Sequence, residues 1–439
     1  MRKLTFASIA SIVMVPALFC SKDSLAISAF ARKYGTSCYT CHAGFATRNS
    51  FGEAFKANGY RWPGGEDADH AKQEQVKLGA DGWKKTFPES PWPSDLPGFA
   101  PVAFFVTGPL VNYSQEATAT KAVPASGSTK AVKVGDQMAQ QTLNWGGPFD
   151  ARILYGGTIG DNIGFFGALQ GFAASGTNIT SQFRATWSFS PGVMLGVGNN
   201  FSFWSSGEDI ATFTGVYPST TGTGVEFSYA AGEKSGGVNI YAGTVGNGAT
   251  AAQLTVTTPG STKTHLDDIR YLRTEYKIGG AGVLSGAGGT YGNEYVGLDN
   301  SVELGASIVN AKPGIFTNTF ANNKTVYGVD ITGSYGSFFG GAAYSRDSDT
   351  KFNNYGVDAG YFFYPWLQGK VAYRNLGDVT TAAGDDKTNP TVTTTVTAWP
   401  RANVSVAAAY KRFTHDTNTT VADLRNNVNT FTLTTAFCF

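Results

Sequence analysis

From residue 100 onward, the chain repeats segments of about ten residues in which apolar and polar side chains alternate with period two. A strand with this pattern has one apolar and one polar face, which suits either a soluble β-sandwich or a membrane β-barrel. The clearest apolar faces are Phe183, Ala185, Trp187 and Phe189; Val302, Leu304, Ala306 and Ile308; Tyr327, Val329, Ile331 and Tyr335; and Leu367, Gly369, Val371 and Tyr373.

Three features favour the barrel. Segments of this length cross a membrane when the strand is tilted. Their polar faces carry Arg, Lys, Glu and Asp, as expected for a hydrated or plugged lumen, although charged residues make up only 15% of the chain against roughly 25% in soluble proteins. Short turns alternate with long connections, and aromatic residues beside the short turns are expected to form the inner girdle. The short turns are Ser190-Pro191-Gly192, Tyr364-Pro365-Trp366 and Trp399-Pro400-Arg401, and the long connections include 206–221, 247–264, 377–390 and 414–426.

We count sixteen or seventeen candidate strands and predict sixteen, because single-chain bacterial barrels have even numbers. The alternation of inner and outer turns slips once, near residues 293–323. The last segment ends in Phe, which resembles the terminal signal that the barrel-assembly machinery recognises; its outward face is Phe431, Leu433, Phe437 and Phe439. After residue 26, no segment is long and apolar enough for a spanning helix, so a membrane form of the protein must be a closed barrel.

Residues 1–26 predict an export signal. Arg2-Lys3 supply the positive region, Leu4 to Phe19 the apolar region, and Ser24-Leu25-Ala26 a cleavage site. The alternative is a membrane anchor, for which the segment is short. Bulky Phe19 argues against lipidation of Cys20. The net charge of +1 argues against nucleic acid and other polyanions as partners.

The exported chain contains Cys38-Tyr39-Thr40-Cys41-His42, a C-x-x-C-H motif. This motif predicts one covalent haem c, with thioether bonds at Cys38 and Cys41 and His42 as the proximal iron ligand. A zinc site would need more ligands than the region offers, and a redox dithiol belongs in a thioredoxin-like unit. Cys438 is left without a partner thiol, so no disulfide framework is expected, and we interpret it as a filler that faces the lumen.

His70 is the candidate distal haem ligand, because it is the only other histidine near the motif. Histidine or methionine at that position would give a low-spin, electron-transferring haem, and an open or methionine-filled position is the alternative. An ordinary surface histidine in the acidic stretch Glu66-Asp67-Ala68-Asp69 is also possible. The remaining candidates are His265, His415, Met138 and Met194.

A short helix is expected after the motif. Ser50-Phe51-Gly52-Glu53 has the spacing of a capping box, Phe51, Ala54 and Phe55 line one face, and Gly59 is a natural stop. The region has too few apolar residues for a large core, so the haem itself is expected to be the core. The candidate residues around it are Phe30, Phe45, Phe51, Phe55, Tyr60 and Trp62.

Residues 29–62 resemble the fused monohaem cytochrome–porin family of iron-oxidising bacteria. The segments that carry the resemblance are Ala29-Phe30-Ala31-Arg32, the C-x-x-C-H motif, Ser50-Phe51-Gly52-Glu53 and Asn58-Gly59-Tyr60. Over the barrel the resemblance is architectural. It implies Cys38 and Cys41 as attachment sites, His42 as axial ligand, and electron uptake from Fe(II) at the cell surface.

The sequence thus predicts a mainly-β outer-membrane protein. Residues 99–439 form an antiparallel porin-like barrel of about sixteen strands in membrane lipid, and residues 27–98 form a small α-helical haem domain that plugs its lumen or lies in the periplasm. We expect an electron-transfer protein with Fe(II) oxidase activity that passes electrons to a periplasmic c-type cytochrome. The alternatives are an electron exporter, and a diffusion porin with a periplasmic haem domain. A soluble haem enzyme is disfavoured because residues 100–439 show no convergent catalytic set. The acidic pairs Glu208-Asp209 and Asp385-Asp386 are expected in outer loops, as solvated charges rather than iron sites.

Overall fold

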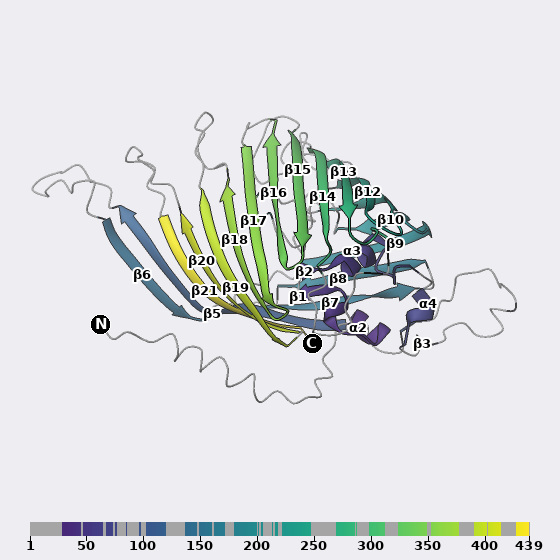
Figure 1. The fold of residues 1–439 in the computed structure, drawn as a ribbon, viewed down its shortest axis with the longest axis horizontal. Coiled ribbons are helices and arrows are strands. Elements are labelled where there is room, and N and C mark those ends of the chain that lie inside the picture. Colours follow the sequence, from purple (N-terminus) through teal and green to yellow (C-terminus); the bar gives the residue numbers. More distant parts are fainter. Residues whose placement is uncertain are drawn as a thin grey trace, which may run out of the picture.

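The computed structural model shows a closed antiparallel β-barrel with a small, partly helical region at one end (Figure 1). The predicted signal peptide, 1–26, lies outside the described residues, and the boundaries 27–98 and 99–439 remain predictions. Residues described are 29–44, 47–64, 67–72, 75–76, 85, 96–97, 102–119, 137–146, 149–159, 162–171, 180–199, 201, 203–204, 213, 216–217, 222–246, 269–285, 287, 298–311, 324–348, 353–376, 390–401, 403–413 and 427–438.

The barrel wall contains seventeen described strand segments that occupy sixteen positions. The segment β6 pairs with the second half of β5, and β7 pairs with its first half, so β6 and β7 together form one interrupted strand. Pairing of β21 with β5 closes the barrel, which confirms the predicted sixteen strands. The segments are β5 (Val102–Ala119), β6 (Gln137–Trp145), β7 (Asp150–Ile159), β8 (Ile163–Gln170), β9 (Thr180–Ser190), β10 (Val193–Gly198), β11 (Thr223–Ala231), β12 (Gly237–Gly246), β13 (Ile269–Gly279), β14 (Ser301–Ala311), β15 (Lys324–Tyr335), β16 (Phe338–Asp347), β17 (Asn353–Tyr364), β18 (Leu367–Asn375), β19 (Thr391–Arg401), β20 (Val404–Phe413) and β21 (Asn427–Cys438).

The connections separate by length between the two ends of the barrel, as predicted. The predicted short turns at 190–192 and 364–366 join β9 to β10 and β17 to β18 at one end, and the predicted long connections lie at the other. The third turn falls later than expected, because Trp399-Pro400-Arg401 forms the last residues of β19 and β20 begins at Val404. The phase slip near 293–323 has a simple cause: the connection 280–300 joins β13 to β14 at the short-turn end but is longer than most connections at the other end.

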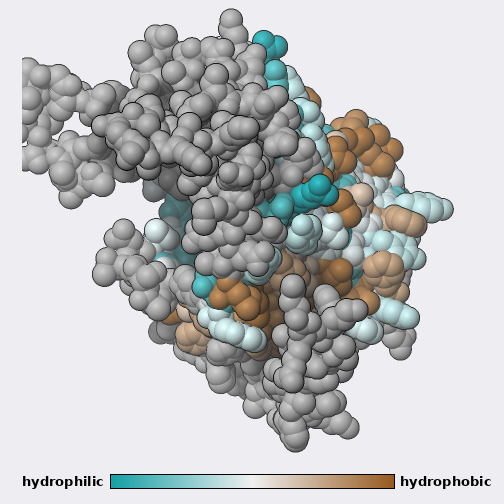
Figure 2. Space-filling view, turned by 90° about the vertical axis from the view of Figure 1, so that its left-hand side faces the viewer, coloured by the Kyte–Doolittle hydropathy of each residue, from teal (hydrophilic) through white to brown (hydrophobic). Residues whose placement is uncertain are grey.

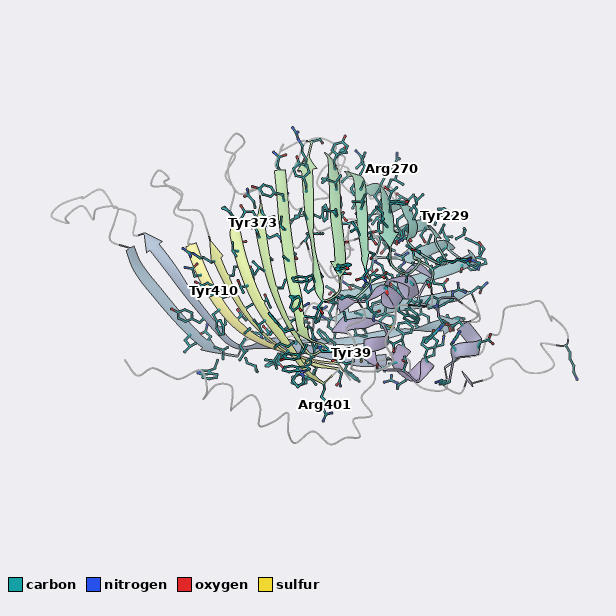
Figure 3. All side chains as sticks on the ribbon, in the orientation of Figure 1. Tyr39, Tyr229, Arg270, Tyr373, Arg401 and Tyr410 are labelled. Carbon is teal, nitrogen blue, oxygen red and sulfur yellow. The ribbon has the colours of Figure 1, made fainter. Side chains whose placement is uncertain are left out.

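The two faces of the strands have opposite chemistry. Outward positions carry exposed apolar side chains, such as Val329 at 53% and Tyr335 at 77% exposure, whereas inward Arg273 and Glu226 are fully buried. Figure 2 shows brown hydrophobic side chains on the outer surface, and Figure 3 shows exposed Tyr229 and Tyr410 along their strands. Most aromatic residues at the short-turn ends form the predicted girdle: Trp187, Phe189, Tyr276, Tyr335, Phe338, Phe363, Tyr364 and Trp366 are all exposed. Trp399 departs from the prediction, because it is 4% exposed and packs in a buried cluster on the inward side.

The small N-terminal region consists of short elements. Its helix α3 starts one residue earlier than predicted: Asn49, not Ser50, is the N-cap and accepts a hydrogen bond from Gly52 N, while Glu53 pairs with Arg48 instead of closing a capping box. Gly59, with φ of +70°, follows the helix as predicted. Among the described residues, no helix is long and apolar enough to cross a membrane. The elements are α2 (Ala29–Tyr34), η1 (Cys38–Thr40), β1 (His42–Gly44), β2 (Thr47–Arg48), α3 (Ser50–Ala57), α4 (Asp67–His70), β3 (Gln75–Val76) and β4 (Leu96–Pro97).

Candidate functional site

The C-x-x-C-H motif forms one tight turn. Cys38 opens the 3₁₀ helix η1, Cys41 follows it, and His42 is the first residue of β1. Both thiols are free and partly buried. Burial raises the pKa of the Cys38 thiol, and burial together with the neighbouring Cys38 raises the pKa of Cys41 to about 12. A redox dithiol has the opposite property, a lowered pKa. The described residues also contain no cluster of three His, Cys, Asp or Glu side chains that would make a zinc site.

The motif is fixed to helix α3 by Asn49, which the sequence analysis did not single out, and by the close approach that Gly52 allows. The Asn49 amide donates to the carbonyl oxygens of Tyr39 at 3.0 Å and Thr40 at 3.1 Å, and the Asn49 backbone N–H donates to the carbonyl of Cys41 at 3.0 Å. A Cβ atom on Gly52 would overlap that same Cys41 carbonyl oxygen. Asn49 therefore caps the helix and shapes the cysteine turn, and Gly52 allows the close approach.

An aromatic cluster surrounds Cys41. Phe51 packs edge-on against Trp62 with ring centroids 4.9 Å apart, and Phe30 packs in the same way against Phe55. Five of the six aromatic residues predicted to pack near the haem belong to the cluster, and Phe45 lies outside the described residues. Tyr34 is a member that the sequence analysis missed. The complete cluster is Tyr34, Phe51, Phe55 and Trp62, with Phe30, Cys41 and Tyr60 packed against it.

His70 lies against this cluster. Its ring stacks on Trp62 with centroids 4.7 Å apart and an interplanar angle of 13°, so the structure brings the candidate distal ligand to the aromatic group that contains Cys41. Among the other candidates, Met194 is buried on β10 beside Gly59, and Met138 lies in β6. His265 and His415 lie outside the described residues.

The small region contacts the inward side of the barrel at its short-turn end. The rings of Phe30 and Tyr60 stack on Phe166 of β8, with centroids 6.4 and 5.4 Å away. Ala43 shares a buried cluster with Phe339, Phe362 and Trp399, which lie at the short-turn ends of β16, β17 and β19. Inward side chains from opposite parts of the wall thus touch the region that carries the motif.

Charged residues on the inward face form paired networks. Arg184 pairs with Glu226 at 2.5 Å, and Tyr271 donates to the other oxygen of Glu226 at 2.6 Å. Arg273 binds Asp330 through two nitrogens, at 2.9 and 3.0 Å. Such pairing satisfies buried charges that would otherwise destabilise the fold, and it confirms the prediction of a charged lumen face.

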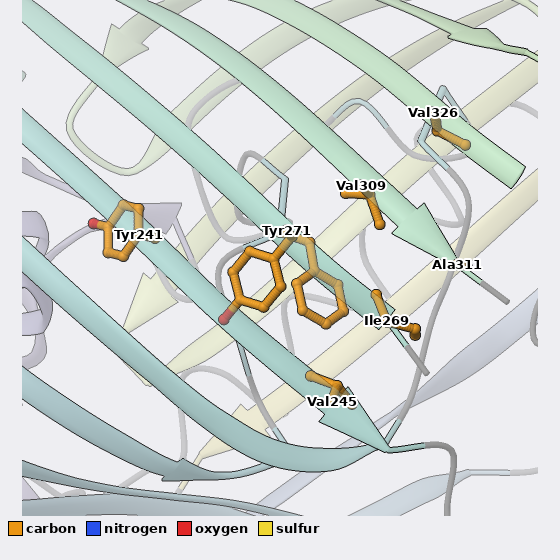
Figure 4. Packing of buried hydrophobic residues seen from close by; sticks show 8 residues of the cluster. Tyr241, Val245, Ile269, Tyr271, Val309, Ala311 and Val326 are labelled. Atoms are coloured by element: carbon orange, nitrogen blue, oxygen red, sulfur yellow. The ribbon is translucent and has the colours of Figure 1, made fainter. Parts of the chain in front are cut away.

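Described residues between β10 and β11 pack inside the barrel, which the sequence analysis did not predict. Phe203 contacts Tyr271 with ring centroids 4.3 Å apart, and Tyr217 donates to Asp330 at 2.7 Å. Figure 4 shows the cluster that receives Phe203: Tyr241, Val245, Ile269, Tyr271, Val309, Ala311 and Val326. The aromatic residues of this stretch are the feature of the sequence that could have predicted its burial, because an ordinary outer loop would be mainly polar. Both acidic pairs, Glu208-Asp209 and Asp385-Asp386, lie outside the described residues.

The third thiol, Cys438, is 1% exposed and faces inward on β21, as predicted. The neighbouring Phe437 is exposed on the opposite face of the strand. It is free, and among the described residues no disulfide is formed.

No protein-family model and no curated protein matches the chain. Among solved structures it is similar to a double mutant of the Rh. blastica porin, with 12% identity, a TM-score of 0.43 and coverage of 78% of this chain and 100% of the porin. It is also similar to Salmonella typhi OmpF in complex with daunomycin (11%, 0.44, 79% and 98%) and to a loop-deletion mutant of OmpT, an outer membrane protein of Vibrio cholerae (12%, 0.41, 77% and 100%). These similarities are low.

The class of the protein follows from its own geometry. The protein is a closed sixteen-stranded barrel with an apolar outer face, an aromatic girdle and a charged inner face. These are the features of a β-barrel that spans a membrane. The protein is therefore a porin-like outer-membrane β-barrel.

Proposed function

We propose that the protein is a monohaem cytochrome–porin that carries electrons across the outer membrane, from extracellular Fe(II) to a periplasmic c-type cytochrome. The observation that carries this proposal is the C-x-x-C-H turn, packed in an aromatic cluster that touches the inward face of the barrel. Bound through Cys38 and Cys41, a haem c would supply one-electron chemistry, with His42 on the iron.

The residues around the turn fit such a group. Cys38 and Cys41 are partly buried free thiols, the groups that add to the haem vinyl groups, and the thioether bonds so formed carry no charge. Asn49 holds the turn in shape, and the surrounding cluster is apolar and aromatic. His70, stacked on Trp62, remains the candidate distal ligand.

The barrel gives the proposal its geometry. Short turns face the periplasm in barrels of this class, which supports a position of the motif on the periplasmic side of the lumen. The hydrocarbon layer is about 30 Å thick, and electron tunnelling falls steeply with distance, so one haem held outside the barrel would not bridge it. A haem domain inside the lumen shortens the path and closes the pore to solutes. Insoluble ferric product would then remain outside the cell.

Absorption spectroscopy of the purified protein in detergent tests the proposal. We expect the air-oxidised protein to show a covalent c-type haem spectrum and to develop sharp reduced bands on addition of Fe(II). Cys41→Ala should abolish the normal two-bond attachment, whereas Cys438→Ala, a matched loss of a buried thiol, should leave it intact. Absence of covalent haem in the native protein would refute the proposal. A haem that dithionite reduces but Fe(II) does not would exclude iron as the donor and favour the electron exporter.

The distal ligand is tested separately. If His70 binds the iron, His70→Ala changes the low-spin spectrum of the oxidised protein. An unchanged low-spin spectrum would show that His70 is not the sixth ligand.

The second candidate function is a diffusion porin, which the charged inward face of a closed barrel favours. Conductance in a planar bilayer separates the two. A plugged conduit conducts poorly, and a stable open channel of porin size in the native protein would favour the porin.

A further inference from the structure

Lys33 and Asp67 form an ion pair that is almost completely buried: Lys33 is 4% exposed and Asp67 is 5% exposed. Residues of these types are rarely buried without a full set of partners, because removing both charges from water is costly. The pair lies in the small region but reaches beyond it. Its surroundings therefore show what the buried charges are for.

Asp67 has a partner at every side. Its Oδ1 accepts from the Tyr34 hydroxyl at 2.5 Å and from the Trp62 backbone N–H at 2.9 Å. Its Oδ2 accepts from Lys33 and, at 3.3 Å, from the hydroxyl of Thr158. One carboxylate thus ties together helix α2, the turn at Trp62 and helix α4.

Thr158 belongs to the barrel, not to the small region. It is a buried residue of β7, and its hydroxyl oxygen accepts from the Lys33 ammonium at 2.6 Å. The hydroxyl has one proton and gives it to Asp67, so both of its hydrogen-bonding roles are used. Lys33, Asp67 and Thr158 form a closed polar triad across the boundary between the small region and the wall.

The wall beside the triad is shaped to admit the small region. A Cβ atom on Gly156 of β7 would lie 2.7 Å from the ring of Phe30, and one on Gly164 of β8 would overlap the carbonyl oxygen of Gly59. Contacts this close exist only because both positions are glycine. Thr158 and Gly156 lie on β7 and Gly164 lies on β8, and these two strands pair directly.

We propose that Lys33, Asp67 and Thr158 are positioning residues that lock the small domain against β7 and β8 as a fixed plug. The inference rests on the plug in the proposed function but not on its redox chemistry, since none of the three residues needs to touch the haem. A domain tethered in the periplasm would have no use for a buried carboxylate shared with the wall.

The test combines planar-bilayer conductance with limited proteolysis of the full-length protein in detergent. Gly156→Ala with Gly164→Ala inserts two methyl groups between wall and domain without changing any charge. Thr158→Val removes the barrel's contribution to the triad, and Asp67→Asn removes its central charge. We expect each variant to lose the closed state of the pore and to expose residues 29–72 to protease. Gly196→Ala is the control, because its Cβ would make an ordinary contact, 3.4 Å from Arg184, so that a methyl group is added to the wall without any overlap.

The outcomes separate the lock from the plug. If the native pore is closed and the glycine and Thr158 variants stay closed and protease-resistant, the lock is wrong while the plug stands. An open native pore would show that the small domain does not plug the barrel. If, in addition, residues 29–72 were equally sensitive to protease in the native and variant proteins, the proposed role of Lys33, Asp67 and Thr158 would also be wrong. Heat-modifiable migration on gels reports whether each barrel has folded, and Thr158→Val carries the test if Asp67→Asn does not fold.

Discussion

The barrel and the small N-terminal region bury opposite kinds of side chain: the barrel encloses charged residues, and the small region encloses apolar ones. The barrel presents Val329 and Tyr335 outward and encloses Arg273 and Glu226, whereas the small region encloses Phe51 and Trp62 and exposes no large apolar side chain among its described residues. The first arrangement suits lipid outside and polar groups inside, and the second suits ordinary burial from water. Where the two meet, neither rule is sufficient, and the contact depends on specific polar groups and glycines.

The comparison predicts where substitutions will be most harmful. Inside the barrel, a charge is stabilised by its partners and not by water. On the lipid side, depth in the membrane decides the cost of a charge. In the small region, local hydrogen bonds shape the motif.

The largest effect is expected for Arg273→Ala. Arg273 is fully buried and binds Asp330 and Glu275, so its removal leaves two carboxylates without their cation. We expect a loss of about 3–5 kcal/mol in the free energy of unfolding, measured by urea titration of the barrel in lipid vesicles. Arg270→Ala, at an exposed position of the same strand, should change it by no more than about 0.5 kcal/mol. Equal effects of the two substitutions would contradict a structural role for the inner pairs.

A lysine on the lipid face should act according to depth. Val329 lies in the middle of β15, and Tyr335 is its last residue. Val329→Lys should cost about 2–4 kcal/mol and Tyr335→Lys about 0–1 kcal/mol, because charge is tolerated near the interface but not at the bilayer midplane. The same vesicle titration measures both. If Tyr335→Lys proved the more costly, the assigned membrane position of the barrel would be wrong.

Most of the barrel could be predicted from the sequence because a strand between lipid and lumen must alternate. Phe183, Val302 and Tyr327 head apolar faces that the structure turns outward. Two features escaped prediction. The interruption between β6 and β7 depends on how both pair with β5, and the inward fold of the connection with Phe203 depends on contacts with distant strands. Periodicity within one segment carries no information about either.

The site was predictable to the extent that a motif defines it. Spacing alone identified Cys38, Cys41 and His42, and their assignment to haem stays a prediction. Asn49 and Asp67 were not foreseen, because an amide before a helix and an aspartate in an acidic stretch look ordinary in sequence. Asp69, two residues after buried Asp67, is exposed. Only tertiary contact distinguishes the two carboxylates.

Acid should weaken the contact between the small region and the barrel. The loss of stability should be smaller than that caused by Arg273→Ala, because protonation of Asp67 leaves its hydrogen-bond partners in place. Burial by itself would raise the pKa of Asp67, but the charge of Lys33 and hydrogen bonds from Lys33, Tyr34 and the Trp62 backbone outweigh it and lower that pKa.

The lowered pKa fixes the sign of the pH effect. Asp67 contributes stability above its unfolded pKa of about 3.9 and loses it as the pH falls through the lower folded pKa. Other titratable or charged groups near the pair are Arg61 and Cys41, which interact with Tyr34, and Asp69 and His70, which lie on the same helix as Asp67. We expect protease resistance of residues 29–72 to fall below about pH 4 in the native protein. Asp67→Asn should remove this dependence, and an unchanged pH profile in that variant would assign the effect to another group.

The smallest effect separates the two roles of Asn49. Its side-chain oxygen caps helix α3, and its amide nitrogen holds the carbonyls of Tyr39 and Thr40 in the cysteine turn. Asn49→Ala should destabilise the small domain by about 1 kcal/mol through loss of the cap, with a further loss from the turn. Asn49→Asp keeps a good cap but turns a buried carboxylate oxygen towards the two carbonyl oxygens, so any destabilisation that remains comes from the side facing the turn and includes their repulsion as well as the two lost hydrogen bonds. Thermal unfolding of the small domain within the full-length protein measures both variants. If Asn49→Asp were as stable as the native protein, the amide bonds would be dispensable, and Asn49 would act in the small domain as a helix cap alone.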